Sequence, residues 1–531
     1  MNKHKLIILG LASVMTLGSC SDSFLEIQKP DGDPLEDYYT TAEHIEEAVV
    51  AAYDPIHWHD WGLGQYNAYN ICSEIMGDDF WVGGSNYGDM QHWHMLGNFE
   101  GNENNTLSTL WTIDYSGVKR CNDVMHYLPN ADITEEYYKS CEMQVRCLRV
   151  FYYNNLWHFF GNVPFYLENL GEPPYTAPQL KADEVYDKLI VELEEVIDSK
   201  VLPVKWDNDN AGRVSQAMAI MMYAEMVAYQ NDESRFSKAY DYLKTQLIGS
   251  NKYELFPDFK GYWDTDNEWN SESIWEINYD QTISERDWGS GQSIGGMVIP
   301  TLISPNQYKG DDEWANNDGW GFMPMRRYVA DELLKGDGRL AGTVWDLTDA
   351  YNADNGLYTQ RDADTHLWLQ KYRPYTKNYA NGTSSSNLNY ANNFRYYRYS
   401  EALLYAAEFA LRSGADAAGT GEAKTWVNMV RNRAGLSGLG SVNINDIFTE
   451  RHKEFVGEGK RYFDLVRAEN ISGVQSENKA TSRLVPVNNA NEGVNVSSAT
   501  RTNSWTPKKK YIPIAQAELD SDPALVQNDY K

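Results

Sequence analysis

The chain has 531 residues, of which 42% are hydrophobic and 13% aromatic, and its formal net charge is −30. A chain of this length can bury a large core and has room for about two to four domains. The negative charge opposes contact with phosphate backbones and anionic lipid head groups, so nucleic-acid binding is excluded as a function. The 17 Trp and 37 Tyr residues are the feature of the composition that most needs a functional explanation.

The first 19 residues predict a secretory signal peptide that ends before Cys20. Two lysines supply positive charge, and the apolar run 6–17 is shorter than the roughly 20 residues that a membrane-spanning helix needs. Leu-Gly-Ser-Cys at 17–20 also looks like a bacterial lipobox, which would make Cys20 the lipidated first residue of the mature chain. The simpler alternative is an ordinary cleaved signal with an incidental cysteine.

Much of the remaining first half shows apolar residues at helical spacing. The segments are 42–52, 105–128, 134–160, 183–197, 215–229 and 235–247. Short turns join helices of similar length, which is the pattern of tetratricopeptide-like pairs that bury a shared core. We therefore predict a mainly α fold, with a helical scaffold over about 40–250 and 394–467.

Four cysteines remain once Cys20 is set aside: Cys72, Cys121, Cys141 and Cys147. So few cysteines in so long a chain do not build a disulfide framework. We expect all four to be buried free thiols.

Residues from about 253 to 393 are rich in Gly, Asn, Asp and Trp, and short extended runs such as 273–277 lie between turn signals. We expect little regular structure there and over about 60–100. Loops carried on a rigid helical frame are where binding residues concentrate, so we predict that these two regions form an irregular ligand-binding half.

The aromatic residues of these loops suggest a saccharide site, because an aromatic ring packs on the C–H face of a sugar while polar side chains bind its hydroxyls. Ordinary packing is the alternative for each Trp, and Trp275, which alternates with apolar neighbours, is the one we most expect in the core. The predicted ligand-binding residues are Trp81, Asn86, Tyr87, Trp93, Trp288, Gln292, Tyr308, Trp314 and Trp320.

Motifs for catalysis or metal binding are weak. The sequence 291–295 matches G-x-S-x-G around Ser293, but no strand precedes it and no helix is expected to follow it, so we interpret it as a Gly-rich loop. The His-x-His pairs at 57–59 and 92–94 lack the further ligands that zinc needs. The acidic run 311–313 could hold structural calcium but does not match an EF-hand. We predict no catalytic residue, no resident metal and no other cofactor.

Four segments of the C-terminal third carry a family resemblance. They are 393–408 (NFRYYRYSEALLYAAE), 423–435 (AKTWVNMVRNRAG), 450–467 (ERHKEFVGEGKRYFDLVR) and 512–530 (IPIAQAELDSDPALVQNDY). Together they resemble the SusD/RagB family of surface glycan-binding lipoproteins. The resemblance implies a single SusD-like domain over 20–531 that binds its ligand without cleaving it.

The same resemblance implies a surface-facing outer-membrane protein, held by a lipid anchor, that captures an oligo- or polysaccharide and delivers it to a SusC-like TonB-dependent transporter. Two alternatives stay open. One is a peptide-binding, RagB-like protein of the same architecture, which a site without exposed aromatic platforms would favour. The other is a surface hydrolase acting through Ser293 or through a carboxylate pair, and with 76 acidic residues the sequence selects no such pair.

Overall fold

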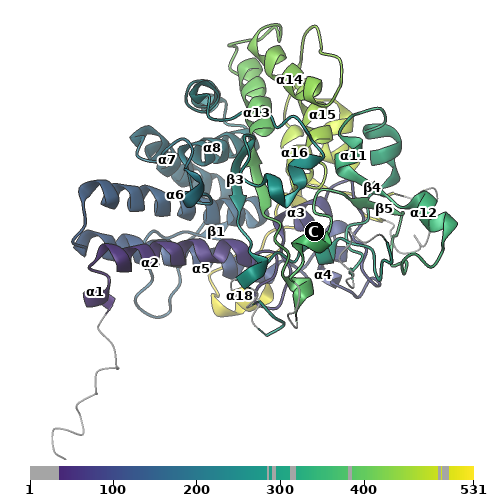
Figure 1. Ribbon diagram of the computed structural model, residues 1–531. Helices are drawn as coiled ribbons and strands as arrows, with labels where there is room; N and C mark the ends of the chain where they lie inside the picture. The colour runs from purple at the N-terminus through teal and green to yellow at the C-terminus, as the bar shows by residue number, and fades with distance from the viewer. Residues whose placement is uncertain are drawn as a thin grey trace, which may run out of the picture.

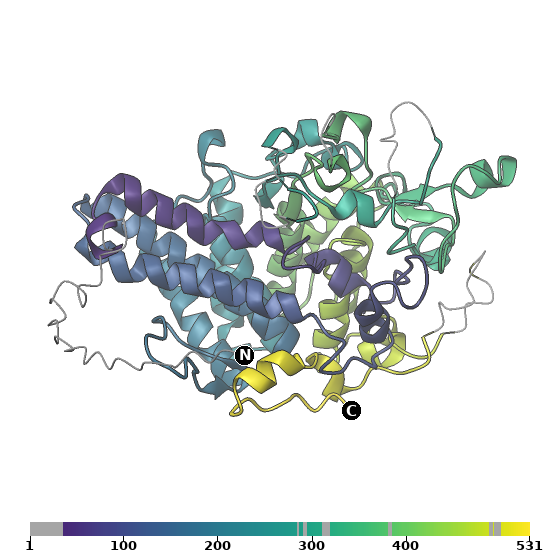
Figure 2. The ribbon, with the colours of Figure 1, turned by 90° about the horizontal axis from the view of Figure 1, so that it is seen from below.

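The computed structural model describes residues 35–283, 286–289, 295–310, 319–380, 385–487, 492 and 501–531. Helices dominate, strands are few and short, and the structure is mainly α as predicted (Figure 1). The long helices gather at one end of the molecule, whereas short elements and loops form the other end (Figure 2). Within the described residues no helix combines the length and apolar character that crossing a membrane requires.

The helices of the first half are α1 (Leu35–Tyr38), α2 (Ala42–Tyr53), α3 (Tyr69–Glu74), α4 (Gln91–Gly97), α5 (Ser108–Tyr127), α6 (Glu135–Phe160), α7 (Ala182–Ser199), α8 (Gln216–Gln230) and α9 (Phe236–Asp241). The sequence predicts six of them, α2 and α5 to α9, to within a few residues. It does not predict α1, and α3 and α4 lie in the region 60–100, where we expected little regular structure. Hydroxyl side chains cap α2, α6 and α8, because Thr41, Thr134 and Ser215 each accept a hydrogen bond from a backbone N–H of the first turn. The helix predicted over 235–247 is α9, which continues as a π-helical turn over 242–247.

These helices pack side by side in sequence order, α5 on α6, α6 on α7 and α7 on α8, with α2 against α5 (Figure 2). α8 is buried along almost its whole length because its sequence is apolar on every side. The four cysteines lie buried and unbonded to one another, as expected.

The remaining helices are α10 (Ile299–Leu302), α11 (Leu340–Thr343), α12 (Thr348–Ala353), α13 (Tyr399–Arg412), α14 (Glu422–Arg433), α15 (Ile444–Glu454), α16 (Arg461–Ala468), α17 (Ala480–Arg483) and α18 (Gln516–Ser521). The strands are β1 (Val163–Pro164), β2 (Gln179–Leu180), β3 (Ser273–Ile277), β4 (Val344–Asp346), β5 (Leu367–Leu369) and β6 (Phe394–Arg398). They pair antiparallel as β1–β2, β3–β6 and β4–β5.

The β3–β6 pair attaches the loop-rich half to the helices. Trp275 lies opposite Tyr397 in this ladder and is 1% exposed, with its indole N–H donating to the carbonyl of Gly212 at 3.0 Å. Trp275 is therefore a core residue, as its pattern indicates.

The charged residues of the recognisable C-terminal segments form a buried ion network. Arg398, which is 1% exposed, binds Glu272 at 2.6 Å, Glu454 at 3.0 Å and Glu458 at 2.8 Å. Arg433 of α14 also pairs with Glu272 and Glu454. Burial by itself would raise the pKa of Glu454, but the surrounding arginines outweigh burial and hold that pKa well below its usual range. These motif residues thus join β6, α14 and α15 inside the frame.

Candidate functional site: an aromatic platform

Four aromatic rings from three loops meet at the surface of the loop-rich half. Trp288 stacks on Trp320 with ring centroids 5.7 Å apart and planes 13° from parallel. The ring centroid of Trp61 lies 5.6 Å from that of Trp288 and 5.9 Å from that of Tyr66, on which Trp61 stacks. Tyr66 in turn meets Trp320 edge-on, with centroids 5.3 Å apart. Each ring therefore contacts two others, and we call these four residues the aromatic platform.

The outer part of the platform is open to solvent. Trp288 is 54% exposed and Trp320 is partly exposed, whereas Trp61 and Tyr66 are buried beneath them. An exposed Trp of this size is uncommon unless it serves an interaction, because leaving the ring in water forgoes the stabilisation that burying it provides. The packed rings underneath fix the exposed ones in position.

A tight turn places Trp61 and Tyr66 side by side. Gly62 and Gln65 exchange two backbone hydrogen bonds of 3.1 Å, and Leu63 and Gly64 between them have φ of 53° and 84°. Two positive φ angles identify the primed turn that suits a two-residue hairpin loop. Since 61 and 66 flank the bonded pair, their side chains project to the same face and stack.

A buried ion pair clamps the loops that carry Trp61 and Trp288. Arg286, at 0% exposure, binds Asp60 through two nitrogens at 2.8 and 3.0 Å. It also donates to the carbonyls of Gly296 at 2.7 Å and of His57 at 2.8 Å. Asp60 in turn accepts from the backbone of Trp61 at 2.8 Å. Two residues after Arg286, Trp288 emerges on the surface in a position set by this clamp.

Burial dominates the electrostatics beneath the platform. Burial raises the pKa of Asp60, while Arg286 and the backbone donors act in the opposite direction. Burial also lowers the pKa of His57 to about 3, so its imidazole is neutral at ordinary pH. The neutral ring adds no positive charge beside Arg286, which leaves the guanidinium free to pair with Asp60.

Trp320 lies in the short segment 319–322, which we call the strap. Backbone hydrogen bonds join this segment to its neighbours. The N–H of Trp320 donates to the carbonyl of Thr301 at 2.8 Å, and its own carbonyl accepts from Arg361 at 3.0 Å. The next residue, Gly321, has φ 70°, accepts from Gly84 at 2.9 Å and donates to Ser304 at 2.8 Å. The strap is therefore held from both sides.

The loop that carries the predicted residues Asn86 and Tyr87 lies beside the platform. Asp89 of this loop is close enough to Tyr66 to contribute to the raised pKa of its phenol, a shift that burial dominates. Asn86 is exposed and closes a turn by accepting from Gly88 at 2.8 Å, and Tyr87 is 40% exposed. The ring of Tyr87 packs against His94, with ring centroids 5.0 Å apart, and lines the small cavity beside Trp81, so it is not part of the platform.

The other described candidates lie elsewhere. Trp81 is 7% exposed, donates to Glu492 at 3.2 Å and carries the guanidinium of Arg326 at 4.7 Å over its ring. The cavity beside Trp81 measures about 50 Å³, which is space for a water molecule or two and not for a sugar ring. Trp81 is thus engaged inside the fold, not in the platform.

Two more candidates are also buried. Trp93 of α4 is fully buried and packs edge-on against Phe322 at 5.0 Å, so it supports the strap that carries Trp320. Tyr308 is 7% exposed and packs against Trp345 at 5.1 Å in a separate small cluster. Neither ring presents a face to a ligand in this structure.

Several predicted residues lie outside the described ranges: Cys20, Gln292, Ser293, Asp311, Asp312, Glu313 and Trp314. Trp61 and Tyr66, by contrast, were not among the sequence candidates although they complete the platform. The segment 61–66, Trp-Gly-Leu-Gly-Gln-Tyr, does contain a signal, because two glycines between aromatics favour a tight turn with both rings on one face.

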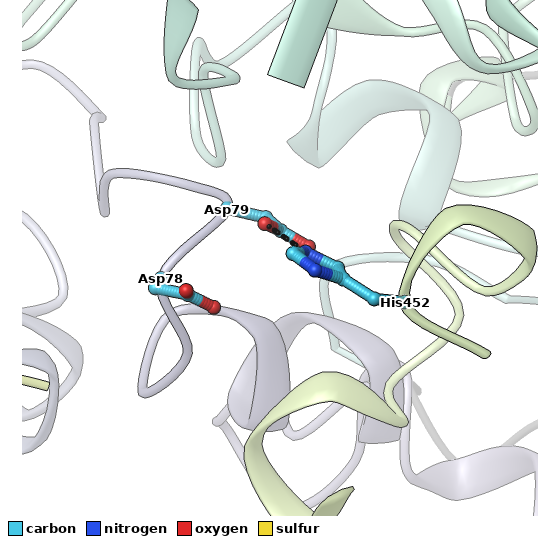
Figure 3. Close-up of side chains that lie close together, drawn as sticks. All are labelled: Asp78, Asp79 and His452. Atoms are coloured by element: carbon cyan, nitrogen blue, oxygen red, sulfur yellow. Dashed lines mark hydrogen bonds and ion pairs between the residues drawn. The ribbon is translucent and has the colours of Figure 1, made fainter. Parts of the chain in front are cut away.

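One group of side chains in the described ranges has metal-ligand spacing, namely Asp78, Asp79 and His452 (Figure 3). The geometry favours ion pairing instead. Asp78 binds Arg461 at 2.8 Å and Arg483 at 2.5 Å, and Asp79 binds His452 at 2.8 Å. Two guanidinium groups beside the carboxylates already supply the positive charge that a cation would provide, so these residues do not fit a metal site.

The fold and the platform together define a ligand-binding protein built on a helical frame. Residues 271–530 match the SusD family model. Surface glycan-binding protein A from Bacteroides uniformis is 60% identical, with a TM-score of 0.83 over 92% of this chain and 100% of that one. Its counterpart from Bacteroides thetaiotaomicron, solved in complex with laminarihexaose, is 46% identical, with a TM-score of 0.83 over 92% and 100%.

A curated relative agrees with these structures. SusD-like protein P2 from Formosa agariphila is 25% identical over 501 residues, which cover 88% of this chain and 91% of the relative. The chain belongs to the SusD family, which confirms the resemblance seen in its C-terminal segments. None of these names describes an enzyme.

Proposed function

We propose that this protein is a cell-surface glycan-binding protein that binds laminari-oligosaccharides and laminarin on the aromatic platform. The observation that carries the proposal is the stacked pair of Trp288 and Trp320, fixed from below by Trp61 and Tyr66 and open to solvent above. The laminarihexaose complex of a relative that is 46% identical over 92% of this chain supports the choice of ligand.

Stacking explains how such a site binds a neutral sugar. The C–H face of a glucose ring packs on an indole face, and each such contact adds on the order of 1 kcal/mol beyond the area that it buries. Hydroxyls at the edge of the sugar ring then need hydrogen-bond partners, and Asp89, whose charge contributes to the raised pKa of Tyr66, is an acceptor near the platform. The exposed platform favours a glycan over a peptide as ligand.

The proposal is one of binding without turnover. The platform acts through ring faces, and Asp60 beneath it is engaged by Arg286 and two backbone donors. A carboxylate so occupied is not available as a general acid or nucleophile. No cofactor is part of the proposed activity.

We further propose that the mature chain begins at a lipidated Cys20, is anchored to the outer membrane facing outward, and delivers glycan to a SusC-like TonB-dependent transporter. The lipobox-like sequence at 17–20 and membership of the SusD family support this part. Labelling of cells with a radioactive or clickable fatty acid, compared with a Cys20→Ala variant, tests the anchor. Absence of label on the wild-type protein would contradict it.

Calorimetry and affinity gels on the chain that starts after Cys20 test the ligand. We expect laminarihexaose to bind, and Trp288→Ala and Trp320→Ala each to weaken binding about tenfold or more, since about 1.4 kcal/mol per lost stacking face is tenfold in Kd. Met429→Ala is the matched control, because Met429 is also an exposed apolar side chain, at 38%, on α14. Hexasaccharides of glucose with other linkages report selectivity.

Each part of the proposal has its own contrary result. Binding that is unaffected by both Trp variants would remove the platform from the site. Failure of the wild-type protein to retain any glycan would point to a peptide ligand. Release of shorter sugars, seen by chromatography after long incubation, would contradict binding without turnover.

A further inference from the structure

A second groove lies away from the platform, between α5, the loop that joins β1 to β2, and the C-terminal segment with α18. Its volume is about 580 Å³, within the range of ligand sites. Figure 1 shows α18 beside α5 and β1, and residues of all three neighbourhoods line this one groove. We call it the α5–α18 groove.

The groove and the platform lie on different faces of α5. Thr112, Tyr115 and Lys119, spaced three and four apart along one face, line the groove. Ile113 faces another way, because its terminal methyl lies within 3.4 Å of where a side chain on Gly62 would begin. Gly62 belongs to the turn between Trp61 and Tyr66, so the helix separates the two sites.

Aromatic rings form part of the wall of the groove. Tyr115 and Tyr166 stack with centroids 5.9 Å apart and planes 10° from parallel, and both are partly exposed. Tyr175, at the rim, is 60% exposed. Three tyrosines with accessible surface around one hollow repeat, on a smaller scale, the arrangement that suits the face of a sugar ring.

One carboxylate that lines the same groove is a candidate hydrogen-bond acceptor. Glu518 of α18 lines it, and among the described residues the structure shows no hydrogen-bond partner for this carboxylate. Burial raises the pKa of Glu518, as expected for a carboxyl group that is partly withdrawn from water without a countercharge. A half-buried acceptor beside aromatic rings is suited to the hydroxyl groups of a saccharide.

The walls are fixed before any ligand binds. Tyr153 donates to the carbonyl of Tyr166 at 2.9 Å and accepts from its N–H at 3.0 Å. Gln179 of β2 exchanges hydrogen bonds of 3.1 and 2.8 Å with the backbone of Val526, which ties the loop to the C-terminal segment. Preformed walls reduce the entropy cost of binding.

We propose that the α5–α18 groove is a second saccharide site, which binds another segment of the same laminarin chain that the platform holds. This inference rests on the proposed function of the platform. Two sites of modest affinity on one protein retain a polymer far better than either does alone, since binding at the first raises the local concentration of glycan at the second. A hexasaccharide gains no such advantage if it fills one site at a time.

Four proteins test the second site: the wild type, Trp288→Ala/Trp320→Ala, Tyr175→Ala/Glu518→Gln, and the combination of all four substitutions. Tyr175 is exposed, and Gln keeps the shape of Glu518 while removing its charge, so the fold should be retained. Calorimetry with laminarihexaose should give two sites in the wild type, one in each double variant and none in the combination. Gels containing laminarin should retain the Tyr175→Ala/Glu518→Gln protein roughly tenfold less strongly than the wild type.

The outcomes separate the two proposals. If the platform variant binds no hexasaccharide and the groove variant retains laminarin like the wild type, the second site is refuted while the platform stands. If the wild type binds no glycan at all, both proposals fail. If the groove variant binds glycan normally but no longer co-purifies with the transporter, the groove is a protein-contact surface and the saccharide assignment is overturned.

Discussion

Arg286 offers a sharp test of how the platform is held, because its side chain is fully buried and cannot touch a ligand that lies on Trp288. The substitution Arg286→Met keeps the length and apolar stem but removes both bonds to Asp60 and those to the carbonyls of Gly296 and His57. Asp60 would then be buried without its countercharge. We expect losses in both stability and glycan binding.

The size of each loss can be estimated. Removing one partner of a buried ion pair costs about 3–5 kcal/mol of stability. Release of the loops would also misplace Trp288 and disturb its stacking on Trp320, and two aromatic contacts at about 0.5–1.5 kcal/mol each correspond to a total of about 1–3 kcal/mol of binding. That is a roughly 5- to 150-fold rise in Kd for laminarihexaose.

The assay combines a thermal melt with calorimetry below the unfolding transition. Arg467→Met is the matched control, because Arg467 is 5% exposed and binds Glu408 at 2.7 Å and Asp464 at 2.8 Å, among the helices of the frame. We expect the control to lower the melting temperature while leaving Kd unchanged. An Arg286→Met protein that is destabilised to a similar degree but binds with wild-type affinity would refute the idea that the clamp positions the platform.

The turn, the ion network and its response to acid give three more tests. Gly64→Ala places a side chain at φ 84°, which should cost about 1–2 kcal/mol of stability and, by distorting the turn, weaken laminarihexaose binding. Gly336→Ala is the control, because Gly336 has φ 74° and is equally uncrowded, and it should only lower the melting temperature. Glu454→Gln breaks a buried pair with Arg398 and should cost about 3–5 kcal/mol of stability. Glu135→Gln breaks an exposed pair with Lys139 and should cost under about 1 kcal/mol. Equal melting temperatures of the two variants would contradict a structural role for the network. The pKa values of Glu454 and Asp78 are held well below their usual range, because arginines outweigh the effect of burial. Their stabilisation is therefore complete well above the unfolded-state pKa of about 4 and is lost as pH falls further. Melting temperatures should fall steeply below about pH 4, and a rise in that range on acidification would contradict this.

Local sequence patterns were sufficient to predict most helices of the frame. Helical periodicity located α2 and α5 to α9 to within a few residues, because amphipathic spacing is a local signal that repeats every one or two turns. The motif containing Arg398 and the one containing Glu454 were recognisable as segments. Their contact at 3.0 Å was not, because an ion pair across 56 residues depends on how the whole frame folds.

The site was only partly predictable for the same reason. Trp288 and Trp320 were selected because Gly and polar neighbours indicate exposure, and the structure stacks them at 5.7 Å. The same reasoning selected Trp81, whose polar neighbours in sequence instead face inward and whose ring is covered by Arg326. Composition around a Trp reports the loop in which it lies, whereas exposure depends on what distant segments place over it.

The residues that hold the helical frame together differ from the residues that form the platform, and this difference affects which residues indicate ligand preference. The residues that make the chain recognisable as a SusD-family member, such as Arg398 and Glu454, are buried in the ion network and have no surface for a glycan. The platform instead depends on three short segments, 61–66, 286–288 and 319–321, whose rings rest on one another and on the buried clamp. Replacing those rings would alter the ligand at little cost to the frame, while the clamp beneath them would have to be kept. Under the proposed function, agreement at Trp61, Tyr66, Trp288 and Trp320 is therefore a better guide to a shared ligand than agreement in the C-terminal segments.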